Sequence, residues 1–338
     1  MTLATLEILM LSCPAEAPPT NCRCEMTSYR YGDLILESDM SLELPRDSDE
    51  TGCGFRVRHA RGPGAVSCQW VQRYCLPDGE PWLSVAKHEG GYLLRFHGLA
   101  DFQACASRRE ILCRSESDTD LETVKHLLLD QVMPRVLSLQ GKLVLHGSAV
   151  VTSAGAIVFI GETGWGKSTL AASFGRQGYP VLADDCLLVE ERDGRLVGVP
   201  SYAGLRLWPG TIAALFGEEL SVHRVAQYTE KRLARLDNGW VSFCTDPVPL
   251  QRVYSLATPQ QGGDTKVITI EALPGRAVFV ELIKSVFRLD VTDQTRLREE
   301  FERLARWATS LDVRRLGFPR EFSFLPAVHD AVLSNISE

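Results

Sequence analysis

The N-terminal third of the chain contains short strand-like runs in which apolar residues are interspersed with a few polar ones. Clear examples are DLILES (33–38), GFRVRHA (54–60), WLSVAKH (82–88) and YLLRFHG (92–98), which are separated by turn sequences such as PDGEP and EGG. Short runs of this composition that are bounded by turn residues are typical of β-strands. The pattern therefore predicts a mostly β domain over residues 26–125.

Two segments show the spacing of an α-helix instead. In residues 121–139 (LETVKHLLLDQVMPRVLSL) the apolar positions recur every three or four residues, which predicts a helix that joins two domains and kinks before Pro134. Residues 293–309 mix Arg and Glu three and four apart, which is typical of an exposed amphipathic helix or an oligomer contact.

The region after residue 141 alternates strands and helices, so we assign residues 126–338 to an α/β domain. KLVLHGSAVV (142–151) predicts a strand, and the wholly apolar AIVFI (156–160) predicts a strand buried on both faces. KSTLAASFGRQ (167–177) is helical in pattern. LLVEERDGRLVGV (187–199) predicts a hairpin that turns at an Asp-Gly pair.

Residues 1–25 have no hydrophobic period and are rich in Pro, Ala and Cys, which predicts a flexible tail. The chain holds 10 cysteines, but no second Cys pair at zinc-finger spacing accompanies Cys22 and Cys24. The start of the chain lacks Lys or Arg before its apolar stretch, and Glu7 interrupts that stretch, so we do not expect a secretory signal. We expect the cysteines to be mainly small buried residues; structural zinc is the alternative.

The charge and hydropathy of the chain limit its partners. The 338 residues carry a net charge of −7, which argues against a broad nucleic-acid surface. No apolar run reaches the roughly 18–20 residues that cross a bilayer. We therefore expect a cytoplasmic protein that binds neither nucleic acid nor membrane.

The most specific motif is GETGWGKST, a Walker A pattern that follows the buried strand and precedes the helix. Glycines allow backbone N–H groups to surround phosphates, and the helix N-terminus adds a positive dipole. We expect the lysine to contact phosphate and the serine to bind Mg²⁺, so the cofactors would be ATP and Mg²⁺. The predicted nucleotide-binding residues are Gly161, Glu162, Thr163, Gly164, Trp165, Gly166, Lys167, Ser168 and Thr169.

A pair of carboxylates follows the loop at short range. Asp184 and Asp185 end the segment VLADD, and the intervening helix and strand should return them to the phosphates. One carboxylate can hold Mg²⁺ while the other accepts the proton of an attacking hydroxyl. A turn-capping role is the structural alternative for the pair. His146, in the strand before the loop, is either a catalytic residue or an ordinary strand residue.

These features together resemble the HPr kinase/phosphorylase family. The order of a His-Gly strand, an apolar strand, a GKS loop and a nearby ADD segment spans residues 145–185. Further stretches resemble a divergent branch that includes kinases of lasso-peptide precursors, so the resemblance extends over about residues 27–335. These stretches are GLRLWPGTIAALFG (204–217), KRLARL (231–236), VPLQRVYSLATP (248–259) and RRLGFPREFSFLPAVHDAVL (314–333).

The resemblance implies a P-loop kinase domain of HPr-kinase type preceded by a smaller, mostly β domain. It implies transfer of phosphate from ATP to a serine hydroxyl, which in the lasso-peptide members is the C-terminal Ser of the precursor peptide. By position, Lys167 binds phosphate, Ser168 binds Mg²⁺, Asp184 is the base and Asp185 supports the metal. His146 matches a family histidine near the catalytic aspartate.

Two positions depart from the bifunctional HPr enzymes. Thr169 stands where they have Glu after GKS, and Ser201 stands where they have a Glu that contributes to the metal site. We therefore expect a kinase without assuming the reverse, phosphorylase activity. A nucleotide-binding accessory or scaffold protein and a small-molecule kinase are the alternatives.

Several further residues allow more than one interpretation. Arg206 can contact phosphate or an acidic acceptor, or lie on the surface, and Lys231 and Arg232 can reach the nucleotide or peptide, or lie on a solvated helix face. Trp165 can stack on adenine, form a wall for the peptide, or pack under the N-terminal domain. We expect three C-terminal arginines to pair with acidic residues or face solvent: Arg314, Arg315 and Arg320.

Overall fold

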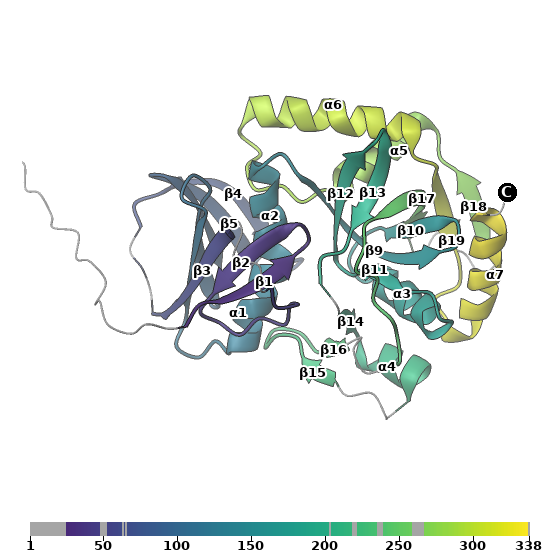
Figure 1. Ribbon diagram of the computed structural model, residues 1–338, viewed down its shortest axis with the longest axis horizontal. Helices are drawn as coiled ribbons and strands as arrows, with labels where there is room; N and C mark the ends of the chain where they lie inside the picture. Colours follow the sequence, from purple (N-terminus) through teal and green to yellow (C-terminus); the bar gives the residue numbers. More distant parts are fainter. Residues whose placement is uncertain are drawn as a thin grey trace, which may run out of the picture.

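The structure is a computed structural model with a mixed α/β fold (Figure 1). Its described residues form two large β-sheets, one small sheet and a few helices. The predicted tail and Cys22 and Cys24 lie outside the described residues, apart from position 25. The structure describes residues 25–47, 53–62, 64, 66–202, 204–217, 222–234, 239–258 and 267–336.

The N-terminal sheet confirms the mostly β prediction for this part of the chain. It has eight strands among the described residues, and β2–β3 and β3–β8 pair in parallel whereas the other neighbours are antiparallel. Alternate side chains are buried in β8, whereas four consecutive residues are buried in β5. In spatial order the strands are β1 (Thr27–Tyr31), β2 (Leu34–Ser38), β3 (Cys53–Arg61), β8 (Glu110–Ser115), β7 (Ala100–Cys105), β6 (Gly91–Phe96), β5 (Pro81–His88) and β4 (Gln69–Cys75).

The helix between the sheets is interrupted by a π-helical turn just before Pro134, where the kink was predicted. Pro134 has no N–H to donate to the carbonyl of Asp130, four residues earlier. The amide of Met133 instead bonds the carbonyl of Leu128, and the Cys186 thiol donates to the Asp130 carbonyl at 3.5 Å. The segments are α1 (Leu121–Leu127), the π turn (Leu128–Val132) and α2 (Met133–Leu139).

The second large sheet is built around β10, the predicted buried strand. All residues of β10 but the first are fully buried, and the strand pairs antiparallel with β9 and parallel with β17. The predicted Asp-Gly hairpin is confirmed between β12 and β13. The strands are β10 (Gly155–Ile160), β9 (Leu143–Thr152), β12 (Cys186–Arg192), β13 (Arg195–Val199), β17 (Val248–Leu256), β19 (Val313–Gly317) and β18 (Thr269–Ala272), with β11 (Val181–Ala183) beside β9.

Two apolar layers cover this sheet. One contains Leu170 and Phe174 of α3 (Lys167–Arg176) together with Val328 and Val332 of α7 (Leu325–Ile336). The other contains residues of α5 (Gly275–Ser285) and α6 (Gln294–Ser310). A three-stranded sheet follows the hairpin, and its elements are β14 (Leu205–Leu207), β16 (Arg232–Ala234) and β15 (Val222–Arg224), with α4 (Pro209–Phe216) between β14 and β15.

The two large sheets are joined by a continuous apolar core. Residues of the N-terminal sheet and of the 121–139 helix share one buried cluster with Val144, Leu188 and Phe287 of the second unit. At the edge of this contact, the Tyr92 hydroxyl donates to Oδ2 of Asp290 at 2.7 Å. The two units therefore pack through buried apolar surface.

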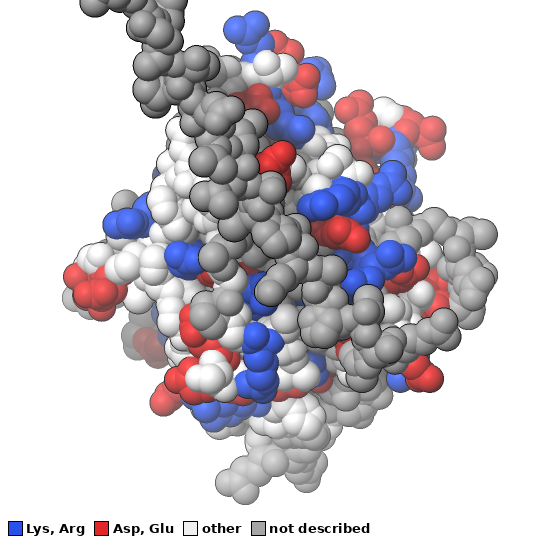
Figure 2. Space-filling view, turned by 90° about the vertical axis from the view of Figure 1, so that its left-hand side faces the viewer, with Lys and Arg blue, Asp and Glu red and all other residues white. Residues whose placement is uncertain are grey.

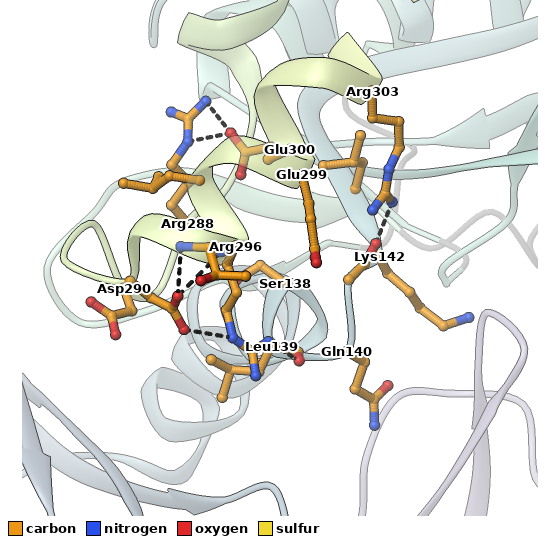
Figure 3. Close-up of a pocket in the computed structure, with 15 residues that line it drawn as sticks. Ser138, Leu139, Gln140, Lys142, Arg288, Asp290, Arg296, Glu299, Glu300 and Arg303 are labelled. Carbon is orange, nitrogen blue, oxygen red and sulfur yellow. Dashed lines mark hydrogen bonds and ion pairs between the residues drawn. The ribbon is translucent and has the colours of Figure 1, made fainter.

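Helix α6 is bound to the connecting helix by its arginines (Figure 3). The guanidinium groups of Arg296 and Arg303 donate to the carbonyls of Leu139 and Gly141, at the end of α2. These contacts line a charged cavity of about 510 Å³. Because Leu304 and Trp307 are buried against α5 and the sheet, α6 is only partly exposed.

The surface charge, the cysteines and the helix hydropathy can be compared with what the composition predicted. Figure 2 shows Lys/Arg and Asp/Glu side chains interspersed over the visible N-terminal face. Cys105, Cys113 and Cys186 are buried, Cys68 and Cys244 are half-buried, Cys75 is exposed, and these six cysteines are free. None of the described helices combines the length and apolar character needed to cross a bilayer.

Candidate phosphate-binding and catalytic site

The loop between β10 and α3 has the backbone that a phosphate-binding loop requires. Gly161, Gly164 and Gly166 have φ of +147°, +85° and +96°, a region that L side chains rarely adopt. Gly166 caps α3 without a side-chain hydrogen bond, so no side chain takes the amide N–H groups of the first turn. These donors and the positive end of the helix dipole lie at the loop.

Lys167 places its charge inside this loop. Its side chain is 4% exposed, and Nζ donates to the carbonyls of Gly161 at 2.8 Å and Glu162 at 3.0 Å. An ammonium has three donors, so one remains for an anion. Burial lowers the pKa of Lys167 to about 8, although the charges of Asp185 and Asp184 oppose this shift. Lys167 therefore favours the binding of a negatively charged group.

The two hydroxyl residues after Lys167 have different surroundings. Ser168 is half-buried in the first turn of α3, and no partner for its hydroxyl lies among the described residues. Oγ1 of Thr169 lies 3.3 Å from Oγ1 of Thr211 in α4. Ser168 is thus the hydroxyl of this pair that can bind a metal ion.

Asp184 is a buried carboxylate held at both oxygens. The Ser148 hydroxyl donates to Oδ1 at 2.6 Å, and the backbone amide of Arg206 donates to Oδ2 at 2.8 Å. Burial and the neighbouring charge of Asp185 raise the pKa of Asp184, while the two hydrogen bonds act in the opposite direction. The result is a fixed carboxylate with increased proton affinity.

Asp185 lies in the bend between β11 and β12 and has a different electrostatic environment. Its φ of +63° is rare for a residue other than Gly, and its side chain is half-buried. Burial acts to raise the pKa of Asp185, but the positive charges of Lys231, Arg206 and Lys167 outweigh it and hold that pKa below the usual range. Asp185 is therefore ionised, and the two carboxylates differ in proton affinity.

His146 lies beside this bend, on β9. Nδ1 lies 3.2 Å from the carbonyl of Asp185, so Nδ1 carries the proton and donates it, and Nε2 is the acceptor. Nε2 is buried and has no hydrogen-bond partner within the described structure. Burial and the charge of Lys167 lower the pKa of His146 to about 4. The imidazole is therefore neutral, with an unused acceptor nitrogen.

A buried ion pair that the sequence did not indicate supports Asp184. Nε of Arg206 lies 2.6 Å from Oδ2 of Asp130, and both side chains are almost fully buried. Tyr202 and His126 also contact the Asp130 carboxylate. The surface reading of Arg206 is therefore wrong. The one indication in the sequence that Asp130 is buried is its position, since it is an acidic residue among the apolar positions of the 121–139 helix.

The remaining predicted basic residues are placed as follows. Lys231 is half-buried and precedes β16, so the helix-face reading of Lys231 and Arg232 is wrong. Arg314 pairs with Asp312 and Arg315 with Glu281, as expected. Ser201, which stands where the bifunctional enzymes have Glu, is buried and donates to the Cys186 carbonyl at 3.0 Å.

Two cavities adjoin the loop, and Trp165 lines both. The first has a volume of about 580 Å³ and is lined by His146, Gly161, Lys284 and Arg315, among others. The second has a volume of about 270 Å³ and is lined by Gly166, Phe318, Arg320 and Phe322, among others. The indole packs over Gly161 and on the core of the α/β unit, so the reading that it packs under the N-terminal domain is wrong.

Protein-family models and curated proteins give no match. Among solved structures, the Hpr(Ser) kinase/phosphatase from Coxiella burnetii is similar over 57% of this chain and 94% of its own, with 14% sequence identity and a TM-score of 0.30. A likeness at this level does not establish a common fold, so the geometry of the site itself has to indicate the chemistry.

Proposed function

We propose that this protein is a Mg²⁺-ATP-dependent kinase that transfers phosphate to the serine hydroxyl of a peptide. The observation that carries the proposal is the meeting of a glycine-rich loop and two unlike carboxylates. His146, which bonds the carbonyl of Asp185, lines one cavity together with Gly161 and Glu162 of the loop. The charges of the two carboxylates also act to raise the pKa of Lys167, which lies 17 positions before Asp184 in the sequence. Phosphoryl transfer needs this combination of phosphate cradle, metal support and base.

The loop fits the triphosphate of ATP. Three glycines in left-handed conformations, the uncapped amides of α3 and the free donor of Lys167 all offer positive or donor groups to phosphate oxygens. Transfer of a phosphoryl group depends largely on positioning and on neutralising charge. This loop supplies both with backbone groups that need no rearrangement.

The residues near the loop also fit Mg²⁺, which prefers oxygen ligands. Ser168 would offer its hydroxyl, and the ionised Asp185 would offer a carboxylate directly or through water. When bound, Mg²⁺ would neutralise phosphate charge and orient the terminal phosphoryl group. The described residues hold no cluster of three or more His, Cys, Asp or Glu, which is consistent with a metal bound mainly through phosphate and water.

Asp184 would act as the general base. Its raised pKa gives it a greater proton affinity than Asp185, so it is the better acceptor for the proton of the attacking hydroxyl. Ser148 and the Arg206 amide would fix the carboxylate and keep it ionised before transfer. Nε2 of His146 would accept a hydrogen bond from the incoming substrate and help to orient it.

The acceptor would enter through the larger cavity beside His146. This cavity adjoins the first residues of the loop, and its lining includes Lys284 and Arg315 together with Glu281, which pairs with both. An acceptor that carries a carboxylate near its hydroxyl would compete with Glu281 for these cations, and the C-terminal Ser of a lasso-type precursor peptide has this chemistry. A small hydroxylated acid shares it and is the second substrate class to test.

The experiment is an assay with Mg²⁺-ATP and three acceptors: a precursor peptide ending in Ser, the same peptide ending in Ala, and free serine. Mass spectrometry should find phosphate on the Ser peptide alone. Phosphate on free serine at a comparable rate would indicate a small-molecule kinase. Binding of ATP without transfer to any acceptor would contradict kinase activity and favour an accessory role.

A further inference from the structure

Arg320 is a partly buried cation without an acidic partner. Its NH2 group donates to the carbonyl of Ala257 at 2.7 Å, and its guanidinium lies 3.9 Å from the ring centroid of Phe318. Nε and NH1 are buried and have no hydrogen-bond partner among the described residues. Burial lowers the pKa of Arg320 to about 10 with no opposing carboxylate. An arginine in this state favours an incoming anion.

The unused donors of Arg320 lie next to the phosphate loop. NH1 is 3.8 Å from the position that a Cβ on Gly166 would occupy, at the cap of α3. The expectation that Arg320 pairs with an acidic residue or faces solvent is therefore wrong. Its position makes it a second cation for phosphate, in a cavity whose lining does not include His146.

The cavity beside Arg320 is lined by side chains that can stack on a flat ring. Its volume is about 270 Å³, and Trp165, Phe318, Phe322 and Leu325 line it. Phe322 is 45% exposed at the edge of this cavity, where a large apolar side chain has no core to join. Aromatic walls and an arginine plane are the groups on which nucleobases stack.

The reactive groups determine which cavity can receive the nucleoside. His146 lines the larger cavity, and its Nδ1 bonds the carbonyl of Asp185, so the transferred phosphate must face that side. The other end of the nucleotide must then leave the loop past Gly166 and Thr169, which line the smaller cavity. Trp165 lines both cavities and so lies between them.

We propose that the smaller cavity binds the nucleobase of ATP between Trp165 and Phe322, and that Arg320 binds the α-phosphate. This inference rests on the proposed function, because it assumes that the loop binds a nucleotide triphosphate. It assigns Trp165 to the wall between the nucleobase and the acceptor peptide.

Calorimetric titration with ATP and with inorganic tripolyphosphate, both with Mg²⁺, separates the base from the phosphates. Phe322→Ala should weaken ATP binding about tenfold and leave tripolyphosphate binding unchanged, because it removes stacking alone. Arg320→Met should weaken both ligands about tenfold. Phe322 is exposed, so its removal should not unfold the chain, and unchanged tripolyphosphate binding verifies this.

The matched controls are Phe301→Ala, an exposed aromatic of α6, and Arg314→Met, an arginine paired with Asp312; both should bind the two ligands normally. If Phe322→Ala keeps full ATP affinity or weakens both ligands equally, the nucleobase site is wrong. If Arg320→Met keeps full affinity for both, the α-phosphate assignment is wrong. If the wild-type protein binds neither ligand, the proposed function itself fails.

Discussion

The backbone amide of Arg206 lies 2.8 Å from Oδ2 of Asp184, while the side chain of Arg206 ends at the carboxylate of Asp130. One residue thus connects the proposed base to the helix that joins the two sheets. Asp130 lies in the π turn that precedes Pro134. This turn of the connecting helix is therefore connected to Asp184 through Arg206.

Substitution of Asp130 by Asn should destabilise the protein strongly. It would leave the buried guanidinium of Arg206 without its counter-charge, and loss of one partner of a buried pair typically costs about 3–5 kcal/mol. Urea unfolding monitored by circular dichroism should show a lower midpoint. Glu110→Gln is the control, because its pair with Arg108 is exposed and screened by solvent and should contribute little to stability. Equal midpoints for the two variants would contradict the role of Asp130.

Removal of the Ser148 hydroxyl should shift the pH dependence of transfer. This hydroxyl stabilises the ionised form of Asp184 and lowers its pKa, so Ser148→Ala raises that pKa further. The base must be deprotonated, and the acid limb of the kcat/KM profile should therefore move to higher pH, with activity about fivefold lower on that limb. Ser84→Ala, which removes a buried serine of β5 that bonds His97, should leave the profile unchanged. An unmoved acid limb in Ser148→Ala would exclude Asp184 as the titrating base.

ATP binding should take up a proton above pH 8. The pKa of Lys167 is lowered to about 8, so part of the protein carries a neutral lysine at pH 9, and phosphate favours the charged form. Calorimetry in two buffers of different ionisation enthalpy should show uptake of up to about one proton at pH 9 and almost none at pH 7. Lys167→Arg, which stays charged, should show no uptake at either pH. A binding heat that does not depend on buffer at pH 9 would contradict this state of Lys167.

The parts of the site that could be predicted from sequence are those set by local pattern. The buried strand 156–160, the glycine-rich loop and the following helix are consecutive in the chain, and the structure has β10, the loop and α3 there. The Asp184-Asp185 pair follows after one helix and one short strand. The strand runs of the N-terminal domain could be predicted for the same reason, since each run and its flanking turn residues lie within a short stretch of sequence.

The supporting contacts could not be predicted in this way. Ser148 and Asp184 lie 36 positions apart, and Arg206 and Asp130 are separated by 76, as the difference of their numbers shows. Only the pairing of β9 with β11 and the packing of the connecting helix bring such residues together. Arg320 was misjudged because the Phe318 ring and the loop around it are tertiary neighbours that leave no period in the sequence.

The roles of the two carboxylates can be separated by matched amide substitutions. Asp185→Asn should raise the Mg²⁺ concentration needed for half-maximal activity, because an ionised oxygen ligand becomes a neutral amide. Asp184→Asn should leave the Mg²⁺ requirement unchanged, because its oxygens are held by Ser148 and the Arg206 amide. A raised Mg²⁺ requirement in Asp184→Asn alone would reverse the two assignments.

The most direct measurement of the central claim is single-turnover transfer of γ-labelled phosphate from Mg²⁺-ATP to the Ser-ending peptide, by the wild type and by Asp184→Asn. Removal of a general base costs about a hundredfold or more in rate, while the loop that binds ATP stays intact. The account predicts labelled peptide from the wild type, transfer at least about a hundredfold slower in Asp184→Asn, and ATP affinity within about twofold. Transfer at equal rates by both proteins would contradict it.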